Sequence, residues 1–251
     1  MHRDRIVGFL RDRLDRDRMS DASLNGLQVE GKEEVRKIVF GVSASLELFR
    51  LAAARGADMI VVHHGLFWGG HPYTVTGGLR KKLDLLLSNG ISLVAWHLPL
   101  DRHPSDGNNA RILRLLGARG QRPFGMDNGN AIGVRGTFAR PRTIPWIESV
   151  LERELSSRPL SFPFGPKAVR TIGIISGGAA RMFEQAVAEG LDLFLTGEAS
   201  EFVQEYAREN RTSFIAGGHY NTEKPGAQAL AGLLRAKFGL RTEFIDVPNP
   251  V

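Results

Sequence analysis

Two adjacent histidines, His63 and His64, end the apolar run of the segment "MIVVHHG". A short apolar run that stops at a glycine is typical of a buried strand in a parallel sheet. Two buried imidazoles are costly unless their nitrogen atoms are bound, and imidazole is the commonest metal ligand among side chains. The pair therefore indicates a metal site at the end of this strand more strongly than two structural histidines.

Other residues with metal-binding chemistry follow other apolar runs. "SLVAWHLPLD" contains His97 and Asp101, "LFLTGE" ends at Glu198, and "SFIAGGHYNTE" contains His219 and Glu223, in what we expect to be a loop. Ligands of open α/β sheets bind beyond the carboxyl ends of the strands, where these residues lie. The chain has no cysteine, so thiolate sites and disulfides are excluded. Imidazoles and carboxylates together suit Zn, Mn or Fe.

Strand and helix patterns alternate around these residues. We expect strands at 37–42 and in "ADMIVVHHG" and "ISLVAWHLPLD", and helices at 46–55 and in "LRKKLDLLLSNG" and "NNARILRLLG". This alternation predicts β–α–β units and a parallel sheet. Residues 121–168 are richer in Gly and Pro, and there we expect one strand at 131–139 and one helix at 144–155.

The later part of the chain repeats the earlier one. A shift of 134 residues places Phe49 on Phe183 and Asp58 on Asp192, and it places His64 on Glu198. We therefore predict an α/β fold of two similar three-layer lobes with mainly parallel sheets and a metal site between them. The lobes are expected at 1–122 and 123–251, the second including an irregular connector at about 121–168.

Composition narrows the class of protein. The chain has 251 residues, 42% of them hydrophobic, and no apolar run of about 18 residues, so a membrane-spanning helix is excluded. The net charge is +6, but Arg and Asp alternate along residues 3–18, where Ile6, Leu10 and Leu14 have helical spacing. This pattern favours a solvated amphipathic helix, and it makes nucleic-acid binding an improbable function. Without a signal or transit pattern, and without cysteine, we expect a cytoplasmic protein.

Seven motifs, spread in order over nearly the whole chain, resemble those of one family. They are "NGLQVEG", "VVHHGLFW", "WHLPLD", "GNNA", "TGEASE", "GHYNTE" and "FIDVPNP". The family is the dinuclear metal-centre proteins related to NGG-interacting factor, also called type 2 homologues of GTP cyclohydrolase I, in its short bacterial form. The resemblance implies a homo-oligomer, a ring of six chains. It also implies two divalent ions per chain, with the ligands His63, His64, Asp101, His219 and Glu223, the last of them bridging.

Two ions with few protein ligands would retain open coordination positions and lower the pKa of a bound water. We therefore expect a metal-dependent hydrolase, and the resemblance alone points to GTP or another nucleotide or phosphate-containing small molecule. The alternative is a non-enzymatic protein for metal delivery, metal storage or scaffolding. His97 and Glu198 are the expected catalytic groups, Glu198 as a proton acceptor. His97 could also be a weak ligand, and Glu198 could instead be an acidic residue near the start of the helix "SEFVQEYARE".

Overall fold

A computed structural model describes residues 1–14, 19–70 and 73–251. The chain forms two compact units: unit 1 is Met1–Leu100 with Gly226–Pro248, and unit 2 is Asp101–Pro225 with Asn249–Val251. The α/β class with two sheets agrees with the sequence. The division expected at 122/123 differs from this one, because the C-terminal helix returns apolar residues to the core of unit 1. Within the described ranges, no helix is both long and apolar enough to cross a bilayer.

Unit 1 is built on a five-stranded sheet. The strand order is β1 (Gly26–Val29), β4 (Ser92–Ala95), β3 (Met59–His64), β2 (Lys37–Ser43) and β11 (Arg241–Phe244). The edge strand β1 is antiparallel to β4, and the other neighbours are parallel. The carboxyl ends of β2, β3 and β4 therefore lie at one edge of the sheet, as the sequence pattern predicted.

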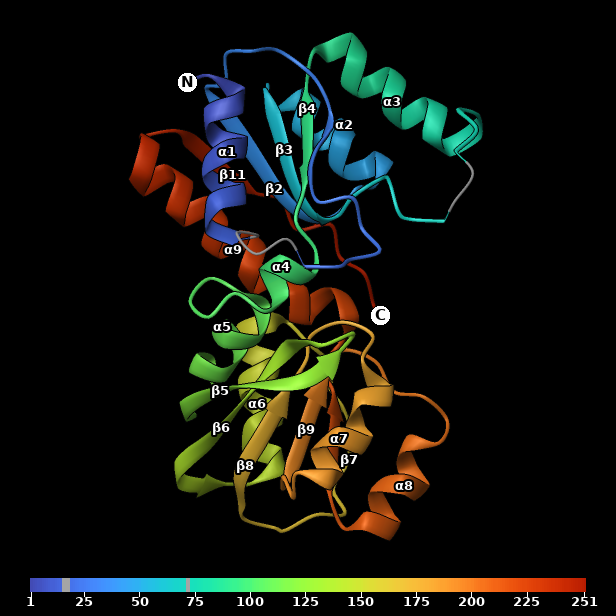
Figure 1. The fold of residues 1–251 in the computed structure, drawn as a ribbon, viewed down its shortest axis with the longest axis vertical. Helices are drawn as coiled ribbons and strands as arrows, with labels where there is room; N and C mark the ends of the chain where they lie inside the picture. The colour runs from blue at the N-terminus through green and yellow to red at the C-terminus, as the bar shows by residue number, and fades with distance from the viewer. Residues whose placement is uncertain (15–18, 71–72) are drawn as a thin grey trace. The chain divides into compact units, whose positions relative to one another are not determined.

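Helices cover both faces of this sheet (Figure 1). On one face α1 (Arg3–Leu14) and the later part of α9 (His219–Phe238) enclose a core that includes Ile6, Leu10, Phe40 and Leu230. On the other face α2 (Leu46–Ala54) and α3 (Gly77–Asn89) enclose a core that includes Phe49, Ile60 and Leu86. The result is a three-layer unit. The helix expected over 3–18 is α1 as far as Leu14, and residues 15–18 lie outside the described residues.

Unit 2 is built on a six-stranded sheet in which β8, β9 and β10 are parallel and the other pairings are antiparallel. The strand order is β5 (Arg119–Asp127), β6 (Asn130–Arg142), β8 (Val169–Ile174), β9 (Leu193–Thr196), β10 (Ser213–Ala216) and β7 (Leu160–Phe162). The helices α5 (Asn108–Leu115) and α6 (Ile144–Leu155) pack on one face. On the other face lie α7 (Phe183–Ala188), preceded by a 3-10 turn at Ala180–Met182, and α8 (Val203–Asn210).

The segment expected to be an irregular connector is mostly regular structure. The strand expected at 131–139 lies within β6, and the helix expected at 144–155 is α6. The hairpin strand β5 was missed because Gly120, Pro123 and Gly125 interrupt its pattern. Proline is tolerated there because β5 is an edge strand.

The internal repeat is visible in the hydrogen bonds of the two sheets. In unit 1 the Asp58 carboxylate accepts the backbone N–H groups of Arg36 and Lys37, at 2.8 and 3.0 Å. In unit 2 the Asp192 carboxylate accepts those of Arg170 and Thr171, at 2.8 and 2.9 Å. Both pairs of acceptor and donors are related by the same shift of 134 residues. Each aspartate thus secures the start of the first strand of its own β–α–β unit.

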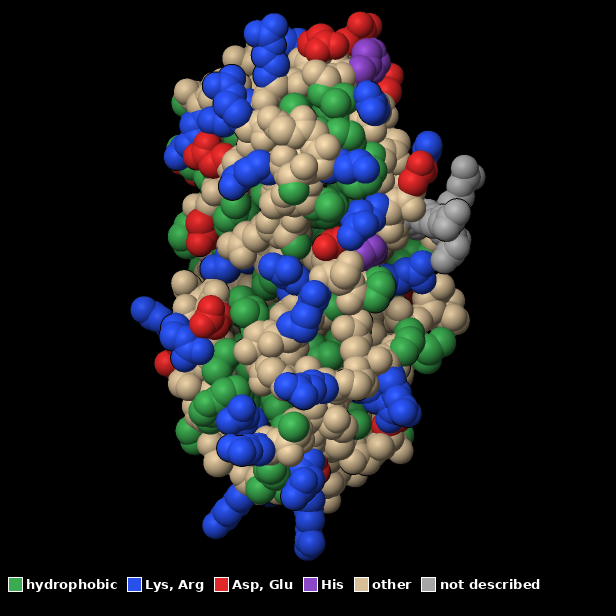
Figure 2. All heavy atoms as spheres, turned by 90° about the vertical axis from the view of Figure 1, so that its left-hand side faces the viewer, with side chains coloured by type: hydrophobic (Ala, Val, Ile, Leu, Met, Phe, Trp, Pro, Cys, Tyr) green, Lys and Arg blue, Asp and Glu red, His purple; other side chains and the backbone are tan. Residues whose placement is uncertain are grey.

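Basic side chains are spread over the molecular face shown in Figure 2, with fewer acidic ones among them. This agrees with the net charge of +6. A surface of this kind raises the local concentration of anions such as phosphates.

Candidate metal centre

Three imidazoles gather where β3 and β4 of unit 1 end. His63 and His64 are the last residues of β3, and His97 follows the neighbouring strand β4. Their ring centroids are 4.7 Å apart for His63 and His64, 5.0 Å for His63 and His97, and 5.6 Å for His64 and His97. Their ligand nitrogens all lie within 4.8 Å of one another. Neighbours on a strand normally point to opposite faces, so their closeness depends on the strand ending here.

Hydrogen bonds fix how these rings are turned. The Nδ1 of His63, a fully buried side chain, lies 2.9 Å from the carbonyl oxygen of Trp96. A carbonyl can only accept, so this nitrogen carries the hydrogen, and in the neutral ring Nε2 has the lone pair. The Nδ1 of His64 lies 3.3 Å from the hydroxyl of Ser43. Both arrangements suit metal binding through Nε2, the usual partner pattern of metal-ligating histidines.

His97 is held by a carboxylate that the sequence did not single out. Its Nδ1 lies 2.8 Å from Oδ1 of Asp21, and its backbone N–H donates to the side-chain oxygen of Asn25 at 2.8 Å. Burial raises the pKa of the Asp21 carboxyl, but hydrogen bonds from His97, Asn25 and the Ser23 N–H outweigh burial and hold the pKa at about 2. Asp21 is therefore ionised at neutral pH. The "NGLQVEG" motif contributes Asn25 to this support.

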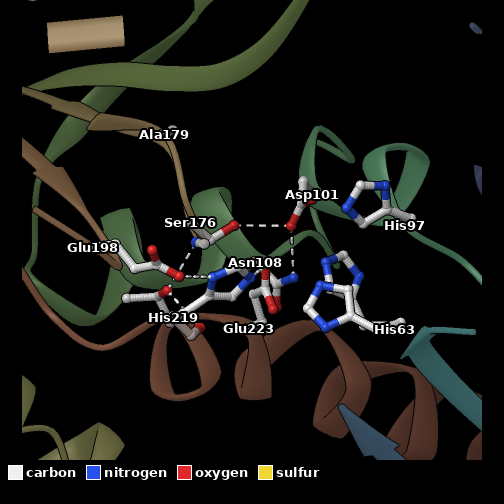
Figure 3. A network of polar contacts seen from close by, with 12 residues as sticks. His63, His97, Asp101, Asn108, Ser176, Ala179, Glu198, His219 and Glu223 are labelled. Atoms are coloured by element: carbon white, nitrogen blue, oxygen red, sulfur yellow. Dashed lines mark hydrogen bonds and ion pairs between the residues drawn. The ribbon is translucent and has the colours of Figure 1, made fainter. Parts of the chain in front are cut away.

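In unit 2, His219 and Glu223 lie in the first turns of α9. We expected a loop here, and the helix changes the meaning of their spacing, because residues four apart share one helical face. Nε2 of His219 is 3.2 Å from Oε1 of Glu223, and Nδ1 is 2.5 Å from Oε1 of Glu198 (Figure 3). Burial lowers the pKa of His219, but the two carboxylates outweigh it and raise the pKa to about 9.

Two glycines make room for this pair. A Cβ at Gly177 would lie 2.3 Å from Oε1 of Glu223 and 3.1 Å from Nε2 of His219. A Cβ at Gly197 would lie 2.6 Å from Cα of His219 and 2.7 Å from the Gly177 carbonyl oxygen. Gly177 also has φ +69°, which disfavours any other residue. These positions must be glycine for the first turn of α9 to approach the strand ends.

Asp101 is buried in unit 2 and is fixed by neutral donors. Its Oδ1 accepts from the Asn108 amide and the Ser176 hydroxyl, each at 2.8 Å (Figure 3). The Ser176 N–H in turn donates to the side-chain oxygen of Asn109 at 2.7 Å. The ligand oxygens of Asp101 and Glu223 lie within 4.8 Å of each other. Unit 2 therefore contains a compact group of two carboxylates, Asp101 and Glu223, and one imidazole, His219.

The structure thus brings the predicted residues into two groups. His63, His64 and His97 are together in unit 1, and Asp101, His219, Glu223 and Glu198 are together in unit 2. Glu198 lies ahead of α8, which begins at Val203, so the interpretation of Glu198 as a helix-start residue receives no support. Its contact with His219 instead gives it a role in orienting that ring.

Sequence reasoning missed the residues that orient the ligands. Asp21, Asn108 and Ser176 lie in polar segments whose patterns are those of ordinary turns or helix starts. The one available signal was "GNNA", where two consecutive asparagines precede an apolar helix, and both Asn108 and Asn109 are fully buried.

Comparisons with known proteins identify relatives that match nearly the whole chain. The chain is 45% identical over 250 residues to the "GTP cyclohydrolase 1 type 2 homolog" of Pyrococcus horikoshii, which covers 99% of both chains. The solved structure of protein ybgI superposes with a TM-score of 0.94 at 38% identity, and that of a Thermus thermophilus protein with 0.91 at 38% identity. Each covers 100% of both chains. The family profile of Duf34/NIF3 (NGG1p interacting factor 3) matches residues 1–250. The chain therefore belongs to the Duf34/NIF3 family.

Proposed function

We propose that this protein holds two divalent metal ions through His63, His64, Asp101, His219 and Glu223. The observation that carries the proposal is that the donor atoms are grouped within each unit and that hydrogen bonds orient them. His63 is hydrogen-bonded through Nδ1 and Asp101 through Oδ1, in the manner of metal ligands with supporting partners. A third support is the contact between Glu198 and Nδ1 of His219.

The donor set limits the choice of metal. It contains imidazole nitrogens and carboxylate oxygens, and the chain has no cysteine. Such a mixture suits Zn, Mn or Fe, whereas Ca²⁺ and Mg²⁺ prefer oxygen ligands alone. Glu223, with a carboxylate in a buried position beside His219, is the proposed bridging ligand.

We further propose that the centre supports hydrolysis of a nucleotide. Bound divalent ions would supply Lewis acidity and lower the pKa of a coordinated water. The chain's own residues would orient the ligands and transfer protons. Ser176 and Asn108 would hold Asp101 in place, and Glu198 would hold His219 or accept a proton. The choice of a nucleotide follows the name of the Pyrococcus horikoshii relative, and the net charge of +6 suits a phosphate-containing substrate.

The test has two stages. Elemental analysis of the purified chain, reconstituted with Zn²⁺, Mn²⁺ or Fe²⁺ and then desalted, is expected to give two ions per chain. At most one ion under saturating conditions would contradict the dinuclear centre. The loaded protein is then incubated with GTP, other nucleotides and phosphodiesters, and products are followed by chromatography.

A loaded protein that turns over none of these substrates would favour the non-enzymatic alternative of metal delivery, storage or scaffolding. Transfer of the ions to a chelator or to an apo-metalloprotein faster than spontaneous release would then support delivery.

We also propose a homo-oligomer, a ring of six chains, from the family resemblance. Light scattering is expected to give the mass of six chains. A value near the 27.6 kDa of one chain at working concentration would contradict it.

A further inference from the structure

The net charge of the chain is concentrated in one segment of unit 2. Residues 107–147 contain seven arginines, no lysine and a single acidic residue, Asp127. The segment therefore carries a charge of +6, which equals the net charge of the whole chain, so the remaining residues balance to zero. The alternation of Arg and Asp that argued against nucleic acid lies in residues 3–18, and this segment has no such alternation.

Most of this segment forms α5 and the antiparallel hairpin of β5 and β6, at one edge of the six-stranded sheet. These elements lie on the left-hand side of unit 2 in Figure 1, and that side, the lower half of Figure 2, shows many basic and few acidic side chains. Five arginines of these elements are exposed, and we call them the arginine face: Arg111, Arg114, Arg119, Arg122 and Arg140.

The charge of the arginine face is not neutralised by carboxylates. Within the described residues, none of its five members forms an ion pair. Exposed arginines elsewhere in unit 2 do so, since Arg153 and Arg208 lie 2.8 and 3.0 Å from a glutamate. Arg114 donates to the carbonyl oxygens of Ala110 and Ser105, but these neutral acceptors leave its charge in place. The positive charge is therefore available to an anion from solvent.

Arg122 is placed where its charge is unfavourable for the sheet. It lies directly opposite Arg135 in the β5–β6 pair, so the two side chains are on the same face. Like charges at such positions destabilise an antiparallel pair. Arg135 is compensated by Glu189 at 2.9 Å, whereas Arg122 has no carboxylate partner in the described part of the chain. A bound anion beside Arg122 would relieve this repulsion.

The chemistry of the arginine face suits phosphate groups. The guanidinium group is a planar fork that binds phosphate through two parallel hydrogen bonds. Unpaired bases bind by stacking on aromatic side chains. Residues 107–147, all of which the structure describes, expose no aromatic ring for this purpose: Phe124 and Phe138 are buried and Trp146 is partly buried. Arginines without stacking platforms favour the backbone of a duplex over a single strand.

We propose that the arginine face binds the phosphate backbone of a nucleic-acid duplex without sequence preference. This function is separate from the metal centre, because none of the candidate metal ligands belongs to the arginine face. If each of the five arginines contacts one phosphate, the logarithm of the binding constant falls against the logarithm of the salt concentration with a slope of about −4.5. Affinity then decreases about 500-fold between 50 and 200 mM salt.

The main experiment measures the fluorescence anisotropy of a labelled DNA duplex of about 20 base pairs, titrated with the full chain in EDTA at about 50 to 200 mM salt. The parent is expected to show the slope given above, and to bind two duplexes of unrelated sequence equally. The double variant Arg119→Gln, Arg122→Gln should reduce the slope to about −2.7, so that affinity falls only about 40-fold over the same range. An RNA duplex should show the same loss, because the phosphates are common to both.

The matched control is the double variant Arg11→Gln, Arg153→Gln, which removes the same two charges from exposed positions outside the arginine face. Each of these arginines lies beside a carboxylate, at 3.6 and 2.8 Å. The control should bind the duplex as the parent does. Melting temperatures check that each variant is folded. Arg122→Gln alone should not lower the melting temperature, because it removes one of two like charges on neighbouring strands.

The outcomes distinguish the arginine face from general charge and from other anionic partners. A parent that binds no duplex at about 50 mM salt would overturn the proposal, as would equal losses of affinity in the arginine-face variant and the control. Tighter binding of polyglutamate than of the duplex would overturn it in favour of an acidic protein. Binding of phosphatidylserine vesicles but not of the duplex would overturn it in favour of a membrane surface.

Discussion

The two units differ at the place where the neighbouring parallel strands of their repeated β–α–β units end: one has imidazoles there and the other has glycines. In unit 1 the residues that end the central strand and follow its neighbour are His63 and His97. Their counterparts in unit 2 are Gly197 and Gly218. The shift of 134 residues relates His63 to Gly197. The backbone N–H of Trp96 donates to Val62 as that of Gly217 donates to Thr196, so the residues that follow, His97 and Gly218, also correspond. Unit 1 therefore supplies donors from its strand ends. Unit 2 has glycine at both positions, and two of its donors, His219 and Glu223, come from α9, whose first turn approaches these glycines.

The two repeated units keep the same hydrogen bonds at the starts of their strands but have different side chains at the strand ends. The aspartates that secure the strand starts, Asp58 and Asp192, make the same pair of bonds in both units. The side chains at equivalent positions differ: His63 and His97 correspond to glycines, and His64 corresponds to the carboxylate Glu198.

The largest effect on stability is expected when a side chain is introduced at Gly197. Gly197→Ala puts a Cβ against the backbone of His219 and Gly177, where nothing can turn away. Overpacking of this kind costs about 1–3 kcal/mol, so urea denaturation should show a lower free energy of unfolding, and metal content should fall. The control Gly232→Ala, in α9 with nothing within 4 Å of its Cβ, should be neutral or stabilising. Equal stability of the two variants would remove the need for glycine at 197.

The next effect concerns the shared support. Asp58→Ala and Asp192→Ala each leave two backbone N–H groups without their carboxylate partner. We expect each variant to lose about 1–2 kcal/mol of unfolding free energy, with nearly additive losses in the double variant because they lie in different units. Chemical denaturation of the metal-free proteins measures this. A loss in only one of the two variants would show that the two aspartates make the same hydrogen bonds but do not contribute equally to stability.

A pH dependence between about pH 6.5 and 9 is expected from His219 of unit 2. The pKa of His219 is about 9 in the folded chain against an ordinary 6.5, so the folded state binds more protons between these values. This contribution to the stability of the metal-free protein is fully present below pH 6.5 and is lost as the pH rises through 9. Melting temperatures in EDTA should therefore fall across this window. His219→Gln should abolish this part of the slope, and an unchanged slope would contradict the assignment.

The smallest effect is expected at Glu198, the counterpart of His64. Glu198→Gln keeps an oxygen that can accept from Nδ1 of His219, so metal affinity should change little, whereas Glu198→Ala should lower it about 10-fold. If the carboxylate also accepts a proton during turnover, Glu198→Gln should lower the rate about 100-fold with both ions retained. Competition with a chromophoric chelator and turnover on one preparation measure both. Equal affinity of the Ala variant and the parent would remove the orienting role.

Much of the fold was predictable because periodicity reports burial directly. The strand that ends at His63 and His64, and the helix at 144–155, followed from their apolar patterns. The edge strand β5 could not be predicted, since its partner β6 and its place in the sheet decide whether Gly120 and Pro123 are tolerated. The unit to which Asp101 belongs could not be predicted either, because it depends on a contact with Ser176, which is distant in the sequence.

The candidate ligands were predictable by residue type, but their supports were not. Histidine at a strand end is a strong signal, because few other roles explain two imidazoles there. Asp21 gives no such signal: an aspartate before "ASLNG" has the pattern of a turn, and only the fold brings it to His97. His219 and Glu223 were assigned to a loop because Gly217, Gly218 and Pro225 mask the start of α9.

The order in which the units can be completed during synthesis follows from how the chain is divided between them. Apart from its last three residues, unit 2 is the continuous segment Asp101–Pro225, so its sheet can close before the end of the chain leaves the ribosome. Unit 1 begins at the N-terminus but lacks a core layer until Leu230, Leu234 and strand β11 have been made. Until then this face of the sheet is covered by α1 alone, and the apolar residues that α9 will bury stay exposed while the second half folds. During that interval the nascent protein is most exposed to chaperones and to aggregation.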